Sequence, residues 1–124
     1  MENLVTSLDI SKRLDALIKD KKETQFYWHW NDEGLVIDHC WVLVLGRIDN
    51  KDIPAYLTDE LAEMLPKEVW GFPLTIRFDD DISTVFYSDD RGAFLDKVFV
   101  KDKSLPEALG LMVEYLVINH FIKL

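Results

Sequence analysis

The amino-acid sequence predicts a mixed α+β fold, with one antiparallel sheet of four to five strands in hairpins and about three helices packed on it. Two apolar periods predict this class. Residues 7–22 and 104–122 repeat apolar residues at helical spacing, whereas residues 24–31 alternate with the period of two that a strand has. Short apolar runs between residues 74 and 101 are separated by turn-forming sequences. The expected order is α-β-β-α-β-β-(β)-α in a single domain, residues 1–124.

Capping residues locate the starts of the three helices. Ser7 or Asp9 is expected to cap the first helix, and Thr58 the short helix in mid-chain. Ser104 and Glu107 have the spacing of a capping box at the start of the last helix. The positions of these residues, just before each helical period, support all three predictions.

A hairpin is predicted after the first helix. Its first strand is the stretch TQFYWHWN, residues 24–31, and its second is the apolar run of residues 35–47. Because the second run is apolar at most positions, we expect it to be central in the sheet. Residues 47–57 are expected to form a loop. The alternation puts Phe26, Trp28 and Trp30 on one face of the first strand, and Tyr27, His29 and Asn31 on the other.

The last helix is apolar on nearly all sides, with Leu105, Leu109, Met112, Leu116 and Phe121 together with Val113, Val117 and Ile118. A helix with this pattern is covered on more than one side. It therefore either lies across the sheet or is also used between subunits, and we expect a homodimer through it.

Composition and charge limit the classes of function. The formal net charge is −9, whereas a nucleic-acid-binding surface is positive, so we expect no nucleic-acid partner. The charge leaves a basic protein partner open. No apolar stretch is long enough to predict a membrane span, and the N-terminus lacks the pattern of a secretory signal. The single cysteine, Cys40, excludes an internal disulfide and is consistent with a cytoplasmic protein.

The aromatic stretch of residues 24–31 has two interpretations. The first is a strand that packs aromatic side chains into the core and pairs across the hairpin with Trp41. The second is a binding surface, in which Tyr27, His29 and Trp41 lie together on the sheet face away from the helices. The first is favoured, and the second gives the candidate surface residues.

Acidic residues gather in two predicted turns. Asp79, Asp80 and Asp81 lie in the first turn, and Asp89 and Asp90 lie in the second. Aspartate is common in turns because its side chain caps backbone amides. Alternatively, the carboxylates bind a hard cation or form a recognition surface for a basic partner. The spacing does not match a calcium-binding loop, so we predict no metal site.

We predict no catalytic residue and no cofactor. His39 and Cys40 are adjacent in a strand, so they point to opposite faces and cannot act as a base and its nucleophile. His120 has no second histidine at helical metal-ligand spacing. The sequence also lacks a nucleophile elbow, a phosphate-binding loop and a dinucleotide fingerprint.

Two segments resemble a family of small uncharacterised proteins from bacteria and their phages. The stretches are IPAYLTDELAEMLPKEV, residues 53–69, and SLPEALGLMVEYLVIN, residues 104–119. They are similar to the family's mid-chain motif IPAxTxxELxEMLP and its C-terminal helix LxxALxxMLxxLIEN. This chain has Val117 and Ile118 where members often have a polar pair. The resemblance covers the C-terminal part of the chain and implies a phage or prophage context and a shared α+β fold, without a catalytic residue to carry over.

Three hypotheses for the function follow from these observations. The first is a phage- or prophage-associated accessory protein that binds another protein without catalysis. The second is an acidic inhibitor, either an immunity protein or a DNA mimic, of a basic partner that processes nucleic acid. The third and least favoured is a small enzyme, which would require His29, His39, Cys40 and the acidic turns to converge.

Overall fold

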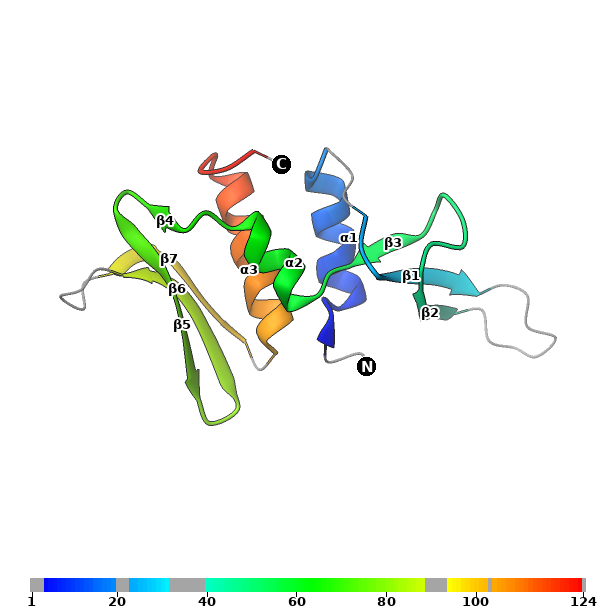
Figure 1. Ribbon diagram of the computed structural model, residues 1–124, viewed down its shortest axis with the longest axis horizontal. Coiled ribbons are helices and arrows are strands. Elements are labelled where there is room, and N and C mark those ends of the chain that lie inside the picture. Colours follow the sequence, from blue (N-terminus) through cyan, green and yellow to red (C-terminus); the bar gives the residue numbers. More distant parts are fainter. Residues whose placement is uncertain (1–3, 20–22, 32–39, 89–93, 103, 124) are drawn as a thin grey trace.

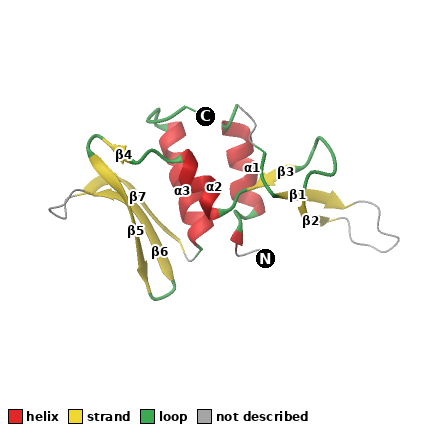
Figure 2. Cartoon of the chain, viewed as in Figure 1, coloured by secondary structure: helices red, strands yellow, loops and turns green. Residues whose placement is uncertain are grey.

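The computed structural model describes residues 4–19, 23–31, 40–88, 94–102 and 104–123, and it has the mixed α+β fold that the sequence predicts. The three predicted helices are confirmed (Figure 2). They are α1 (Leu8–Leu17), α2 (Thr58–Met64) and α3 (Leu105–Ile118). The strands are β1 (Phe26–Asn31), β2 (Cys40–Leu45), β3 (Ile53–Ala55), β4 (Glu68–Val69), β5 (Phe72–Asp79), β6 (Ile82–Ser88) and β7 (Phe94–Asp102).

The strands form two antiparallel sheets, whereas the sequence predicted one. One sheet has the order β2-β1-β3 and the other the order β4-β5-β6-β7. The helices lie between them, so the sheets form the two ends of the molecule (Figure 1). Helix α3 packs on β6 and β7 and also on α1 and α2, while α1 packs on β3. The structure also has two strands absent from the predicted order, β3 and β4, one at an edge of each sheet.

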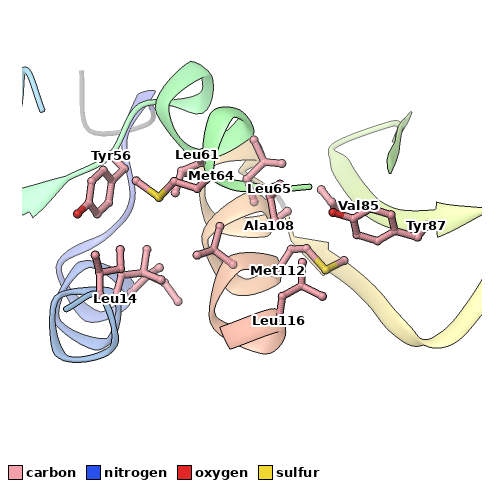
Figure 3. Close-up of a cluster of buried hydrophobic side chains, with 14 of the residues drawn as sticks. Leu14, Tyr56, Leu61, Met64, Leu65, Val85, Tyr87, Ala108, Met112 and Leu116 are labelled. Atoms are coloured by element: carbon pink, nitrogen blue, oxygen red, sulfur yellow. The ribbon is translucent and has the colours of Figure 1, made fainter. Parts of the chain in front are cut away.

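Helix α3 occupies the middle of the main apolar core. Leu109, Met112, Val113 and Leu116 are fully buried, together with side chains of α1, α2 and β6 (Figure 3). Most of the apolar side chains of this helix are thus covered within one chain, whereas Ile118 is exposed, and the dimer through this helix stays a prediction. No helix in the described part of the chain is long and apolar enough to cross a membrane.

Helices α1 and α3 pack closely at Gly110. A methyl group at this position would lie 2.8 Å from Cγ2 of Ile10 and 3.1 Å from Cγ2 of Thr6. Glycine therefore allows the two helix backbones to approach each other. The start of α1 is fixed here as well, because the Ser7 side chain accepts a hydrogen bond from the Ile10 N–H, as predicted.

The other predicted caps are wrong in detail. The Ser104 side chain makes no capping bond, and the Glu107 carboxylate accepts a hydrogen bond from the backbone N–H of Ser7 instead of closing a capping box. Leu57, not Thr58, is the N-cap of α2, and the Glu60 carboxylate accepts a hydrogen bond from the Leu57 N–H at 2.8 Å. Glu60 in the first turn of α2 thus accepts from a backbone N–H at the start of its own helix. Glu107 in the first turn of α3 accepts from a backbone N–H at the start of α1.

The three-stranded sheet differs from the predicted hairpin in one respect. β1 and β2 pair antiparallel as predicted, but β1 is the central strand and β2 lies at the edge. The other edge, β3, lies within the predicted loop of residues 47–57 and contains Pro54. Proline is tolerated at an edge because a backbone N–H is not needed there.

The four-stranded sheet contains two short turns. Trp70 and Gly71 join β4 to β5, and both have positive φ, 52° and 82°, as a two-residue turn of type I′ requires. Asp80 and Asp81 join β5 to β6, and Asp80 also has a positive φ of 50°. The hairpin of β5 and β6 extends beyond the ends of the helices (Figure 1).

Candidate functional site

The predicted surface residues are divided between the two ends of the molecule. Tyr27, His29 and Trp41 belong to the three-stranded sheet, whereas Asp80 and Asp81 form the turn between β5 and β6 (Figure 1). Asp79 is the last residue of β5, with its side chain outside the description, and Asp89 and Asp90 lie outside the described residues. The structure therefore does not bring the two predicted groups together.

The prediction that Tyr27, His29 and Trp41 share an exposed face is wrong. In the register of β1 and β2, Trp30 is opposite Trp41 and His29 is opposite Val42. Directly opposite residues lie on the same face, so Trp41 lies on the face opposite to His29. Tyr27 is only 3% exposed and the Arg47 guanidinium lies 4.6 Å from the centre of its ring.

The interpretation of this stretch as core packing holds for Tyr27 and Trp28, which are buried, whereas Trp30 is 42% exposed and pairs with the partly buried Trp41. Its ring lies 5.6 Å from that of Trp30 in an edge-on arrangement, with 64° between the planes. The ammonium group of Lys12, on α1, lies 5.2 Å from the centre of the Trp41 ring. The predicted cross-strand pairing with Trp41 is thus confirmed, and the pair joins the hairpin to the first helix.

The turn between β5 and β6 forms an exposed projection that we call the hairpin tip, consisting of Phe78, Asp80, Asp81 and Ile82. The Phe78 side chain is 66% exposed, and all four residues are exposed. Together with Ser83 they line an open hollow of about 440 Å³. The tip thus combines two carboxylates with two apolar side chains that the fold leaves in contact with water.

A second polar cluster, which we call the His29 loop, consists of His29 and residues 46–52. Its centre is Asp52, whose side chain is 1% exposed. Nδ1 of His29 is 2.7 Å from Oδ1 of Asp52 and 3.6 Å from Oδ2 of Asp49. The other oxygen of Asp52 accepts hydrogen bonds from the backbone N–H groups of Ile48, at 2.7 Å, and Asp49, at 3.2 Å.

Hydrogen bonding keeps Asp52 ionised. Burial raises the pKa of its carboxyl, but the hydrogen bond from His29 and those from the backbone N–H groups of Ile48 and Asp49 outweigh burial. The pKa therefore lies below the ordinary value of 3.8. Because an ionised carboxylate only accepts hydrogen bonds, the proton of the His29 contact is on Nδ1.

The His29 loop was not predicted from the sequence, although its donor atoms fit a metal ion. One ligand atom each from His29, Asp49 and Asp52 lie within 4.8 Å of one another, and such a set suits zinc or manganese. However, the Arg47 guanidinium donates to the carbonyls of Asp49, Asn50 and Asp52 at 3.3–3.4 Å, which places a cation beside these carboxylates. These contacts are explained by closure of the loop on itself. The turn sequence after Gly46, which contains Asp49 and Asp52, could have predicted such a closed loop.

The residues named for the enzyme hypothesis do not converge in the described part of the chain. His29 lies on β1, and Cys40 is exposed at the start of β2, opposite Asn31. The Asp80–Asp81 turn belongs to the other sheet, and His39 lies outside the described residues. Exposed carboxylates are also dispersed, on α1 at Asp9, on α2 at Asp59 and on β4 at Glu68.

No known protein-family model matches the chain, and neither a curated protein nor a solved structure shows significant similarity to it. The resemblance to small bacterial and phage proteins therefore stays a prediction, and the function is inferred from the surfaces alone.

Proposed function

We propose that this chain is a non-catalytic protein-binding module in a phage or prophage context, and that the hairpin tip contacts its partner. The observation that carries the proposal is the exposure of Phe78 and Ile82 beside the carboxylates of Asp80 and Asp81 on a projecting turn. Exposed apolar side chains next to polar groups are typical of interaction sites. A hairpin that extends beyond the helices is accessible to a large partner.

The charge of the tip indicates the kind of partner. Asp80 and Asp81 are acidic residues of a chain with net charge −9, so a partner with a basic surface is attracted over a distance. The apolar side chains supply the contact area, and the carboxylates supply specificity and speed of association. The complex should therefore weaken as salt is added.

The alternative of an acidic inhibitor receives less support. An inhibitor that replaces a nucleic acid needs its carboxylates on one face, whereas the exposed carboxylates of Asp9, Asp59, Glu68, Asp80 and Asp81 lie on several elements. A basic partner that processes nucleic acid would still fit the tip. The difference is that binding would then depend on a few residues of one turn.

The test is affinity capture from bacterial lysate, with and without phage infection, using the wild-type chain and two variants. Phe78→Ser removes apolar contact area. The double variant Asp80→Asn/Asp81→Asn removes charge, and asparagine keeps the positive φ at residue 80 accessible. Ile118→Ser and the double variant Asp9→Asn/Asp59→Asn are the controls, because they remove an exposed apolar side chain and two exposed carboxylates at positions elsewhere.

A basic protein captured by the wild type and by both controls, but not by either tip variant, is the expected result. The affinity of the purified pair should fall by about tenfold or more in each tip variant. A protein that all five chains capture equally would contradict the role of the tip. Turnover of a substrate by the purified chain, lost in His29→Ala, would contradict a non-catalytic function.

A further inference from the structure

The edge strand β2 differs from the other strand edges of this molecule. The two sheets end at β2, β3, β4 and β7. An edge strand presents unpaired backbone groups that can pair with another chain, and proteins commonly protect such edges with proline, charge or short length. The four edges can therefore be compared by the protection that each one has.

One hydrogen bond fixes the direction of the backbone groups of β2. The Gly46 N–H donates to the carbonyl of Gln25 at 2.8 Å, at the end of the β1–β2 ladder. In an antiparallel ladder, alternate residues bond to the same neighbour. The N–H and C=O groups of Trp41, Leu43 and Leu45 therefore point away from β1. Among the described strands, none lies on that side of β2.

The sequences of the other three edge strands contain features that β2 lacks. β3 has three residues, and its middle residue, Pro54, has no N–H to offer. β4 has only two residues. The sequence of β7 contains Asp96, Lys97, Lys101 and Asp102. By contrast, β2 reads CWVLVL and has neither a proline nor a charged residue.

We propose that the β2 edge pairs antiparallel with β2 of a second copy of this chain, forming a two-fold symmetric dimer. The three strands of each copy would then form one continuous six-stranded sheet. Pairing about Leu43 places the outward backbone groups of each strand opposite those of the other. In this pairing, Trp41, Leu43 and Leu45 of both copies lie on the same face of the joined sheet. The side chain of Leu45, which is 77% exposed, then lies opposite Trp41 of the second copy.

Charge favours a second copy over a basic peptide as the occupant. Lys12 lies over the Trp41 ring on one face of the sheet, and Arg47 lies over the Tyr27 ring on the other. These two cations would repel a basic segment added beside β2. The β2 strand of a second copy has no charged residue of its own, so it adds no cation to this edge, and both of its faces are apolar.

The test measures the mass in solution over a wide range of concentration by analytical ultracentrifugation. Leu45→Pro removes one outward N–H and an exposed side chain without removing a bond to β1. Leu45→Lys introduces the charge that protects other edges. Ile48→Lys adds the same charge at an exposed position beyond the strand, and Ile118→Lys adds it on α3.

A wild-type mass of about twice 14.5 kDa is expected, with dimerisation weakened by about tenfold or more in both Leu45 variants and unchanged in Ile48→Lys and Ile118→Lys. Hydrogen exchange by NMR gives a second readout, because the amides of Trp41, Leu43 and Leu45 should be protected only at high concentration. A wild type that stays monomeric would overturn the proposal. So would a dimer that Ile118→Lys dissociates and the Leu45 variants do not.

Discussion

The two sheets of this molecule are attached to the same helices by different means. The four-stranded sheet is attached by apolar packing, since Val85 and Tyr87 of β6 are fully buried in one cluster with Met112 and Leu116 of α3 (Figure 3). The three-stranded sheet has a smaller buried cluster of Val5, Trp28 and Ala55, with partly buried side chains around it.

Specific polar contacts supplement that smaller cluster. Nε1 of Trp28 donates to the carbonyl of Thr6 at 3.2 Å, which connects β1 to the start of α1. His29 and Asp52 connect β1 to the loop between β2 and β3. Apolar packing is insensitive to pH, whereas contacts of an ionised carboxylate depend on it. The comparison therefore predicts that the two sheets respond differently to the same kinds of change.

Leu116→Ala should have the largest effect on stability, because it creates a cavity in the cluster between α3 and the four-stranded sheet. We expect the free energy of unfolding to fall by about 2–5 kcal/mol, measured by urea denaturation. Ile118→Ala is the control on the same helix, since Ile118 is 56% exposed and should lose about 0.5 kcal/mol or less. Equal losses in both variants would show that α3 is not packed as described.

Asp52→Ala tests the polar attachment of the three-stranded sheet. It removes the acceptor for His29 and for two backbone N–H groups, so we expect a loss of about 2–3 kcal/mol in the free energy of unfolding. Asp49→Ala is the control, because this carboxylate is 51% exposed, accepts from the Lys51 N–H within its own turn and lies farther from His29 Nδ1, at 3.6 Å, so its loss should cost less than about 1 kcal/mol.

The loss in Asp52→Ala should depend on pH, unlike that in Leu116→Ala. Because the folded-state pKa of Asp52 is below 3.8, the ionised carboxylate stabilises the fold fully above pH 3.8, and this contribution is lost as the pH falls through the lowered pKa. The difference from wild type should therefore be smaller at about pH 3 than at about pH 7, measured by urea denaturation. An unchanged difference would mean that Asp52 acts through packing alone.

The spacing of apolar residues in the sequence was sufficient to predict the helices and strands that pack on each other through apolar side chains. Helices α1 and α3 follow from the helical spacing of their apolar residues, and strands β5 to β7 follow from apolar runs of seven to nine residues between turn-forming sequences. Strands β3 and β4 have three and two residues, too few to show a period. The edge position of β2 depends on β3 pairing with β1, so it could not be predicted from the apolar content of β2 itself.

The candidate surfaces were predicted unequally for a related reason. The hairpin tip lies within one local sequence, so Asp80 and Asp81 could be placed in an exposed turn from composition. The His29 loop joins residues that are 23 positions apart, and the contact of His29 with Asp52 is produced by the tertiary fold. Tyr27 is covered by Arg47 for the same reason, which the alternation of a single strand does not reveal.

Phe78→Ser should have the smallest effect on stability, and it tests whether the exposed end of the four-stranded sheet is needed for the fold. Because its side chain is mainly in water, we expect a change of about 0.5 kcal/mol or less in the free energy of unfolding. If the free energy of unfolding is unchanged and partner binding is lost, the tip binds the partner without contributing to the packing of the four-stranded sheet. A loss above about 2 kcal/mol would instead mean that Phe78 packs on the fold, and the loss of binding could then be attributed to unfolding. The apolar attachment of this sheet therefore leaves its projecting end available for a partner, whereas the three-stranded sheet uses its polar side chains to hold its own loop.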